Sequence, residues 1–426
     1  MTRGEKMMAN RARRWIAAGA ALVALATAAV VPSAASAQDF SGGGPNWYMD
    51  AMKIAPIHEA GITGEGVTIA VFDGGLYLDA PTLQGADIEV PDFDGCHDPL
   101  DYAPTQYEEL KHGTSVTSLI VGNGTSDSGE GPKGIAPEAH ILYYGALQGG
   151  DSLGQSPYTC KAPFEDVLDD AVTRGTDIVT MSGGSAKLAE ELSEGAYESV
   201  AKALRAGVVI VAGLPNDDTV WTFELDEGNG VINVASVDAT AAPAKKRYSE
   251  EDMADPNTDV TAPGIGVAGV GFNDTWGMTT WQGNSAATPL VAGLIALGMQ
   301  KWPDATAAQL TQSLIRNTGS NPHELERSDR YGYGIVNATR FIAEDPTQYP
   351  DEHPLFVEER SPSFDAVYNP PSPTPTPEPV AAPQSELPMA LVSLALVVVL
   401  ALAAVAGVII LIVVVVKRSR RAPDAS

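Results

Sequence analysis

The chain has 426 residues, of which 54 are acidic and 26 basic, so its net charge is −28 and its isoelectric point is near 4.4. Nucleic acids and anionic lipids are bound through basic patches, so this acidic composition excludes nucleic acid as a partner. Solubility in an exterior medium accounts for the acidic excess, and recognition of a basic partner is the alternative.

Residues 1–37 are predicted to be a secretory signal peptide. The basic stretch RARR precedes the apolar run WIAAGAALVALATAAVV, and the small residues SAASA end just before Gln38. This order of charge, apolar run and small residues is typical of export signals, and we expect cleavage after Ala37.

The chain has two cysteines, Cys96 and Cys160. Because an exported chain enters an oxidising compartment and the count is even, we predict that they form one disulfide. A metal site made by Cys96 and His97 is disfavoured, since adjacent residues rarely chelate together and the chain has no second such pair.

Five short runs rich in β-branched residues are predicted to be strands. Several of them are apolar throughout rather than alternating, which is typical of strands buried on both faces of a parallel sheet. The runs are VTIAVF (67–72), HILYYGAL (140–147), DIVTMS (177–182), VVIVAGL (208–214) and VINVASV (231–237).

Amphipathic segments lie between these strands. In FEDVLDDAVTRG the apolar residues recur at i, i+3, i+4, i+7 and i+8 from Phe164 to Val172, and Gly175 follows as a C-cap. The spacing recurs from Tyr197 to Leu204. The alternation of strands and helices predicts an α/β fold, a parallel sheet with helices on both faces, over residues 38–346 with an N-terminal extension.

Two polar residues stand where such a sheet collects functional groups, beyond the carboxyl ends of its strands. Asp73 directly follows the first strand, and Gly74 and Gly75 allow the backbone to turn sharply behind it. Taken alone, an aspartate there could cap the next segment. His112, in KHGTSVTSLIVGNG, is expected at the start of a helix, with its ring projecting into a cleft.

Ser285 lies in WQGNSAATPLVAGLIAL, where a glycine-containing turn gives way to a long apolar run. We expect it to begin a helix, so the helix-cap and nucleophile interpretations are not exclusive: the helix start presents its hydroxyl and amide. A helix N-terminus also offers free N–H groups to a developing oxyanion. The order Asp, His, Ser in glycine-rich junctions is one of the known orders of a catalytic triad.

Beyond residue 346 the regular alternation ends. Residues 347–387 are predicted to be a proline-rich linker, a stalk rather than a peptide ligand, because NPPSPTPTPEPVAAP favours extended backbone. Residues 388–416 are apolar over a length that crosses a bilayer, so we expect one transmembrane helix. The basic tail, residues 417–426, is expected to be cytoplasmic, and the domain outside the cell membrane.

The motifs resemble those of the subtilisin-like serine peptidases. VTIAVFDGG, HGTSVTSLIVG and GNSAATPLVAG are similar to the family's aspartate, histidine and serine motifs. DIVTMSGGS resembles its substrate-binding strand, GVVIVAGLPND the segment with its oxyanion asparagine, and VTAPGIGV a further segment before the serine. The resemblance implies an endopeptidase of protein or peptide substrates.

Carried over by position, the resemblance assigns a role to each residue. Asp73, His112 and Ser285 form the triad, and Asn216 serves the oxyanion hole. Ser182, Gly183 and Gly184 resemble the backbone that pairs with an extended substrate.

Four positions depart from the family pattern. Gly74 stands where Ser or Thr is usual, Ser115 where a second His is usual, and Asn284 where Thr is usual. Pro215 replaces the glycine before the oxyanion asparagine, and proline restricts both its own backbone and that of the residue before it.

A narrower resemblance concerns the two ends. NWYMDAMKIAPIHEAGITGEG and the stalk, helix and basic tail are similar to the mycosins, actinobacterial subtilases associated with type VII secretion. This implies membrane proteins of a secretion complex as partners. The alternative function is a scaffolding component of such a complex with weak or no peptidase activity. An esterase is disfavoured because no G-x-S-x-G elbow surrounds Ser285.

No cofactor and no metal site is predicted for catalysis. Acidic loops such as DFDGCHDPLD leave a structural calcium ion open, as in many subtilases, although no ligand spacing of a defined calcium loop occurs. The sequence does not indicate side-chain specificity or oligomeric state.

Overall fold

In the computed structural model the chain divides into two compact units, Met1–Pro370 and Pro371–Ser426. The predicted signal peptide, Cys96, Cys160, Gly183 and Gly184 lie outside the described residues. The described residues are 40, 42–93, 100, 103–145, 163–182, 193–217, 228–247, 249–370 and 400–414.

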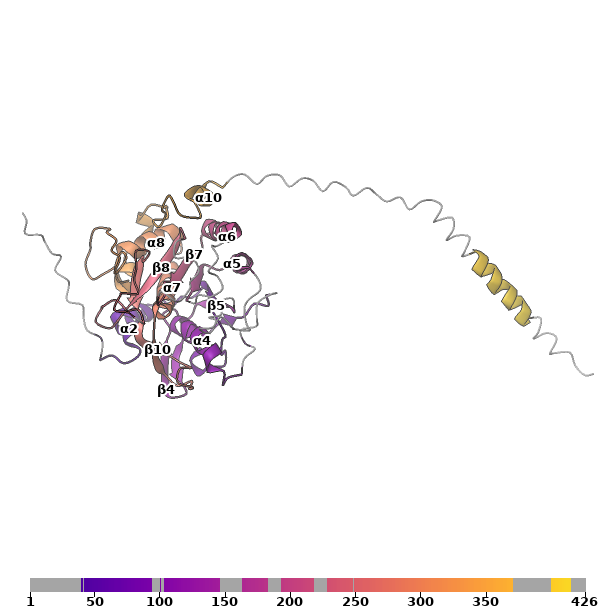
Figure 1. Cartoon of the computed structure of the whole chain (residues 1–426), viewed down its shortest axis with the longest axis horizontal. Coiled ribbons are helices and arrows are strands. Elements are labelled where there is room, and N and C mark those ends of the chain that lie inside the picture. Colours follow the sequence, from indigo (N-terminus) through magenta and orange to yellow (C-terminus); the bar gives the residue numbers. More distant parts are fainter. Residues whose placement is uncertain are drawn as a thin grey trace, which may run out of the picture. The chain divides into compact units, whose positions relative to one another are not determined.

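A seven-stranded sheet forms the centre of the first unit (Figure 1). Its strand order is β2-β5-β1-β6-β7-β8-β9, and every neighbouring pair is parallel. The five predicted strands are confirmed as β1, β5, β6, β7 and β8, with ends that differ by up to three residues. The strands are β1 (Thr68–Phe72), β2 (Ile88–Glu89), β5 (His140–Tyr144), β6 (Ile178–Met181), β7 (Val209–Gly213), β8 (Val231–Val237) and β9 (Val260–Pro263).

Helices cover both faces of the sheet, as the alternation predicts. In β1, Ile69 and Val71 belong to the core that includes α4 (Tyr107–Val121) and α7 (Asn284–Lys301), whereas Ala70 and Phe72 belong to the core on the opposite face. That second core includes α5 (Phe164–Thr173) and α6 (Glu194–Arg205), which pack side by side (Figure 1). The strands are therefore apolar throughout because both faces are buried.

Helix α7 is buried on all sides over its first fifteen residues, from Asn284 to Gly298. A helix that is apolar all round belongs inside a large core rather than on a surface. It packs against β6, β7, β8 and β9, so the sheet fixes the position of its first turn.

The N-terminal extension was predicted without secondary structure of its own, and two hairpins were not predicted at all. The extension contains α2 (Trp47–Ala51) and α3 (Ile54–Glu59), and a short 3-10 turn, η1 (Pro81–Leu83), follows β1. The hairpins are β3 (Asn123–Ser126) with β4 (Gly129–Lys133), and β10 (Ile265–Gly269) with β11 (Thr279–Gln282).

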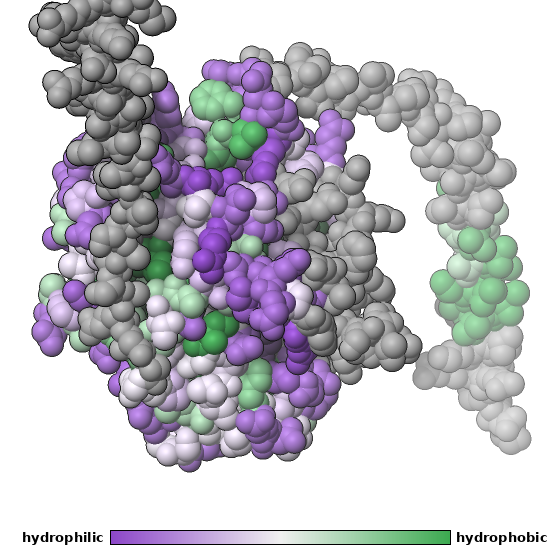
Figure 2. Space-filling view, turned by 60° about the vertical axis from the view of Figure 1, so that its left-hand side comes forward, coloured by the Kyte–Doolittle hydropathy of each residue, from purple (hydrophilic) through white to green (hydrophobic). Residues whose placement is uncertain are grey.

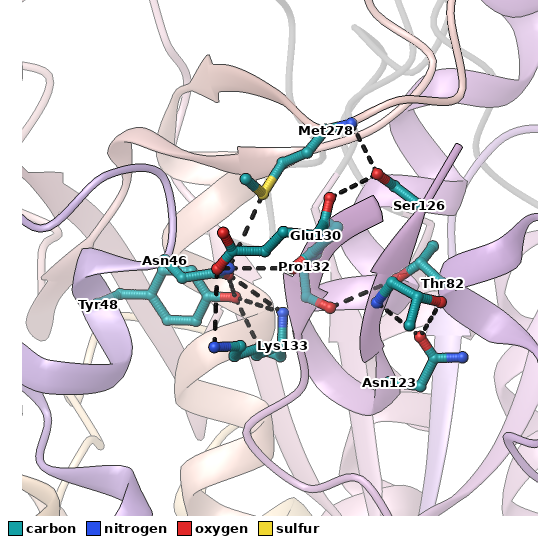
Figure 3. A network of polar contacts seen from close by, with 11 residues as sticks. Asn46, Tyr48, Thr82, Asn123, Ser126, Glu130, Pro132, Lys133 and Met278 are labelled. Carbon is teal, nitrogen blue, oxygen red and sulfur yellow. Dashed lines mark hydrogen bonds and ion pairs between the residues drawn. The ribbon is translucent and has the colours of Figure 1, made fainter. Parts of the chain in front are cut away.

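The extension is joined to β4 by a buried polar network (Figure 3). The hydroxyl of Tyr48, which is fully buried, lies 2.7 Å from the carbonyl oxygen of Lys133 and 3.1 Å from its amide nitrogen. The side-chain amide of Asn46 donates to the carbonyl of Gly131 at 3.0 Å. Because these groups are buried and satisfied, the extension is part of the domain rather than a loose leader.

The compact unit also extends beyond the predicted domain end at residue 346. Its last elements are α8 (Ala307–Arg316), α9 (Ala338–Ala343), η3 (Pro346–Gln348) and α10 (Phe364–Tyr368), and α10 packs against α6. The side-chain amide of Asn229 donates to the carbonyls of Val357 and Arg360, each at 2.9 Å. Residues 347–370, assigned to the linker from sequence, are thus packed on the domain, while 371–387 lie outside the described residues.

In the second unit the structure describes one apolar helix, residues 400–414, which is green throughout in Figure 2, in contrast to the largely polar face of the first unit. The predicted membrane helix, 388–416, falls only partly within the described residues, and the tail 417–426 falls outside them. Among the helices that the structure describes, none is both long enough and apolar enough to cross a membrane.

Candidate active site

Asp73 and His112 meet at the carboxyl end of β1. Asp73 follows the last residue of β1 and is 2% exposed. The ring of His112 projects from α4, and its Nδ1–H donates to Asp73 Oδ1 at 2.8 Å. The backbone N–H of Gly74 donates to the same oxygen at 2.7 Å. With Nδ1 as the donor, Nε2 of the neutral ring carries the lone pair needed to accept a proton.

The second carboxylate oxygen of Asp73 is less well supported. Oδ2 is buried and has no hydrogen-bond partner within the described part of the chain. The residue after Asp73 is Gly74, which has no side-chain hydroxyl to donate. An unpaired buried carboxylate oxygen is costly, and such exceptions concentrate at functional sites.

The charge of Asp73 also acts on the basicity of His112. Burial lowers the pKa of His112, but the neighbouring Asp73 carboxylate, through its charge and its hydrogen bond, outweighs burial and raises the pKa above the usual value of 6.5. An opposite charge within hydrogen-bond distance favours the protonated ring. His112 is therefore suited to hold a proton taken from a neighbouring group.

The position of His112 within its helix differs from the prediction. We expected His112 at a helix start, but α4 begins five residues earlier, at Tyr107. Glu108 and Glu109 in the first turn favour this earlier start, because acidic residues stabilise a helix N-terminus. Leu110 also packs in a buried cluster with Trp276, which anchors the first turn.

Gly113, next to His112, leaves room for a hydroxyl group. A Cβ atom at Gly113 would lie 1.9 Å from the hydroxyl oxygen of Tyr143, so only glycine fits there. That hydroxyl is 3.1 Å from the carbonyl oxygen of Gly74, to which it donates. Tyr143 on β5 thus supports the turn that follows Asp73.

Ser285 lies in the first turn of α7, as the sequence predicts, but it is not the helix cap. The N-cap is Gly283, with φ of +139°, and the helix begins at Asn284. The N–H groups of a first helical turn have no intrahelical partner, so the amide of Ser285 is free to serve a ligand. The residue is 8% exposed.

Asn216 lies beside the start of α7. Its side-chain Oδ1 accepts a hydrogen bond from the backbone N–H of Asn284 at 2.7 Å. A Cβ atom at Gly283 would lie only 2.9 Å from the same oxygen, so this approach requires glycine. Pro215 therefore does not keep Asn216 away from the helix that carries Ser285.

The structure brings the Asp73–His112 pair and the Ser285–Asn216 pair to the same end of the sheet, the carboxyl ends of its strands. Asp73, Ser182 and Asn216 follow the carboxyl ends of the neighbouring strands β1, β6 and β7. Trp281, four residues before Ser285, contacts the His112 ring edge-to-face at 5.5 Å between centroids. Among the described residues, no hydrogen bond joins His112 to Ser285, and such catalytic contacts are often longer without substrate.

The roles predicted for the other site residues stay predictions. Ser182 is 6% exposed, and its hydroxyl has no partner among the described residues. Gly183 and Gly184, and the predicted pair of Cys96 and Cys160, are not covered by the description. No group of three His, Cys, Asp or Glu side chains that could hold a metal occurs in the described ranges.

Sequence reasoning missed the supporting residues of the site. Asn284 was noted only as a departure, yet it is fully buried and bonds to Leu214, Pro215 and Ser236. Tyr143 was assigned only to a strand. The polar tip of Tyr143 in an apolar run, and Asn284 beside Ser285, were the signals available.

Comparison with known proteins places the chain in a family. Residues 64–334 match the model of the subtilase family of peptidases, which is more than half of the chain. The chain belongs to the subtilase family. It is thus a subtilisin-like serine peptidase by family membership.

Two curated relatives are from Bacillus subtilis. The minor extracellular protease Epr is 28% identical over 307 residues, which cover 70% of this chain and 42% of Epr, so the chain spans less than half of that relative. The major intracellular serine protease is 31% identical over 277 residues, covering 63% of this chain and 80% of the relative.

A solved structure of the same fold is the MycP3 protease from the type VII (ESX-3) secretion system. It superposes with a TM-score of 0.52 at 22% identity, over 74% of this chain and 90% of MycP3. At this identity the similarity shows the subtilisin-like fold.

Proposed function

We propose that this subtilase is a membrane-anchored endopeptidase whose catalytic triad is Asp73, His112 and Ser285. The hydrogen bond from His112 Nδ1 to Asp73 Oδ1, at the carboxyl edge of the sheet, is the observation that carries the proposal. It orients the ring and fixes the tautomer in which Nε2 accepts a proton.

In the proposed reaction, Ser285 Oγ attacks the carbonyl carbon of the substrate while His112 Nε2 takes the hydroxyl proton. The peptide C–N bond then breaks, and His112 gives the proton to the leaving amine. Water repeats the sequence on the acyl-enzyme, which releases the acid and restores Ser285. Asp73 stays ionised and stabilises the imidazolium formed in each half.

The proposed oxyanion hole consists of the Ser285 backbone N–H and the side-chain amide of Asn216. Because Asn216 Oδ1 accepts from Asn284, the other end of the amide, Nδ2, is the group available to donate. A side-chain donor of this kind is typically worth about 100- to 1000-fold in rate.

The substrate is proposed to be a protein or peptide bound in extended form along Ser182, Gly183 and Gly184. Backbone pairing of this kind gives affinity with little sequence preference, so selectivity would come from side-chain pockets. Ser182 directly follows the last residue of β6, the strand next to β1, which supports the proposal for the first of these residues.

The proposed location is outside the cell membrane, with a single helix at 388–416 and a cytoplasmic tail at 417–426. The export signal and the apolar stretch in the sequence support this. We further propose a place beside membrane proteins of a type VII secretion complex, supported by the fold shared with MycP3.

A second candidate function is a structural component of a secretion complex with weak or no peptidase activity. Two observations favour it: Asp73 Oδ2 is unpaired, and no hydrogen bond joins His112 to Ser285 among the described residues. The position of Asn216 beside α7 favours the enzyme.

A fluorophosphonate probe applied to the full chain separates the two. The wild type and Ser199→Ala, a control at a buried serine on α6, are expected to be labelled, and Ser285→Ala is not. A folded wild-type chain that stays unlabelled would overturn the enzyme proposal. In cells, a secretion defect that Ser285→Ala still rescues would support the scaffold.

A further inference from the structure

The segment Leu214–Asn216 follows β7 and lies beside the start of α7, and its backbone needs partners outside the sheet. The N–H of Leu214 donates to Val234 of β8 at 3.1 Å, which extends the strand pairing by one residue. Pro215 has no N–H to donate, so from here the sheet ladder cannot continue. The carbonyl groups of Leu214 and Pro215 must therefore be satisfied by another group.

Asn284 supplies that group. Its side-chain Nδ2 donates to the carbonyl oxygens of Leu214 at 3.0 Å and Pro215 at 3.1 Å. Its Oδ1 accepts from the amide of Ser236 at 2.9 Å and from the Ser236 hydroxyl at 2.7 Å. All the hydrogen-bonding capacity of a fully buried amide is thus used between β7, β8 and α7.

The same residue is tied to Asn216 through its backbone. The N–H of Asn284 donates to Asn216 Oδ1 at 2.7 Å, while the side chain of Asn284 holds the carbonyl just before Asn216. Asn216 is therefore fixed at both its backbone and its side-chain oxygen by one neighbour. Nδ2 of Asn216 then remains as the side-chain donor that could serve an oxyanion at Ser285.

We propose that Asn284 is a positioning residue that sets the geometry of the oxyanion hole, and this rests on the proposed function. Asn284 does not touch the reacting atoms; it acts through Asn216. The threonine usual at this position has one hydroxyl, which cannot donate to two carbonyls and accept from Ser236 across the same distance. Pro215 and Asn284 are then complementary departures: proline stiffens the segment, and asparagine holds its carbonyl groups.

The test compares Asn284→Thr with the double variant Asn284→Thr/Pro215→Gly in the full chain. The first readout is fluorophosphonate labelling, separated into a maximal rate and a half-saturating concentration. Asn284→Thr is expected to lower the maximal rate about 10- to 100-fold, because small misplacement of a catalytic donor costs up to about 100-fold, with the half-saturating concentration changed less than about threefold. Restoring the family pair in the double variant is expected to recover part of that loss.

The matched control is Asn229→Thr. Asn229 is also buried, 1% exposed, and its amide also donates to backbone carbonyls, those of Val357, Arg360 and Pro362. It is expected to lower the denaturant midpoint as Asn284→Thr does, without changing the labelling rate. If both variants lose labelling only in proportion to stability, or if the double variant is no better than Asn284→Thr, the positioning role is overturned.

A second readout does not depend on activity. Hydrogen exchange measured by mass spectrometry reports on peptides that contain residues 213–217 and 283–287. If Asn284 positions Asn216, exchange is expected to be faster in both peptides of Asn284→Thr and unchanged in Asn229→Thr. Unchanged exchange in Asn284→Thr would overturn the positioning role. If the folded wild type is not labelled by fluorophosphonate, the proposed function fails, and the exchange result still decides whether Asn284 holds Asn216.

Discussion

The two halves of the candidate site are supported in different ways. Around Ser285, five hydrogen bonds of Asn284 connect the helix start to β7 and β8. Around Asp73, one oxygen accepts from both His112 and Gly74, and the other has no partner among the described residues. The Ser285 half is held by a buried polar network, and the Asp73 half by a single charged contact, the one with His112.

The difference shows how departures from a family pattern can be read. Pro215 and Asn284 depart together, and the structure joins them by a hydrogen bond, so each accounts for the other. Gly74 departs alone, and Oδ2 of the preceding Asp73 has no partner among the described residues. A compensated departure predicts retained geometry, and an uncompensated one predicts a weaker contact.

The largest expected effect on labelling comes from a change in the Asp73 half of the site. Asp73→Asn removes the charge that orients His112 and stabilises its protonated form, so fluorophosphonate labelling is expected to fall about 10⁴-fold. Asp177→Asn is the control and is expected to keep its labelling. Asp177 lies at the amino end of the strands, where its carboxylate accepts a hydrogen bond from the amide of Thr68. A loss below tenfold in Asp73→Asn would show that this contact is not catalytic.

The next largest effect is expected from a change in the Ser285 half of the site. Gly283→Ala forces a Cβ atom to within 2.9 Å of Asn216 Oδ1 and places alanine at φ of +139°, so Asn216 must move. We expect labelling to fall about 100-fold, the size of a lost oxyanion donor. Gly207→Ala has positive φ in open space and controls for backbone strain. Equal loss of labelling in both variants would contradict the role of Asn216.

The pH dependence of labelling follows from His112. Asp73 raises the pKa of His112 above 6.5, and only the neutral ring can accept the proton of Ser285. The rate is therefore expected to fall about tenfold per pH unit on the acid side, starting above pH 6.5. In Asp73→Asn, measured at its lower rate, the midpoint moves to lower pH. A midpoint that does not move would show that Asp73 does not control His112.

The smallest effect is a gain. Gly74→Ser adds a hydroxyl to the residue that follows Asp73, whose Oδ2 has no partner among the described residues, and a hydrogen bond between the two would reduce the difference between the two halves. We expect labelling to rise by no more than about threefold, since a neutral hydrogen bond near a carboxylate contributes little beyond the contact already present. Progress curves for the two proteins, run side by side, measure this, and a fall in rate would count against the argument.

The sequence predicted the sheet well because its central strands are buried on both faces. Such strands are unbroken apolar runs, as in VINVASV, and β8 has the predicted bounds. The hairpin of β3 and β4 was missed because GEGPK is polar and glycine-rich, and its pairing depends on contacts with Asn46 and Tyr48. Local pattern does not contain such tertiary contacts.

Within the candidate site, the sequence indicated which residues could carry chemistry but not what holds them. Asp73, His112 and Ser285 follow from motif and order, while the meeting of His112 with Asp73 spans 39 residues. The partners of Asn284 lie 48 to 70 residues away along the chain, so a buried amide next to a serine gave no sign of its role. Side-chain partners of this kind are determined by the tertiary structure rather than by residues nearby in the sequence.

The tie between Asn229 and the end of the compact unit has a mechanical consequence. Tension applied to the chain beyond Pro370 would reach α10 and its packing on α6 first, and then the bonds from Asn229 to Val357 and Arg360. Asn229 stands two residues before β8, so the load enters the sheet at the amino end of that strand. The site lies at the carboxyl end of the parallel strands. Such tension would therefore be borne at the amino ends of the parallel strands, opposite to the carboxyl ends that Asp73 and Asn216 follow.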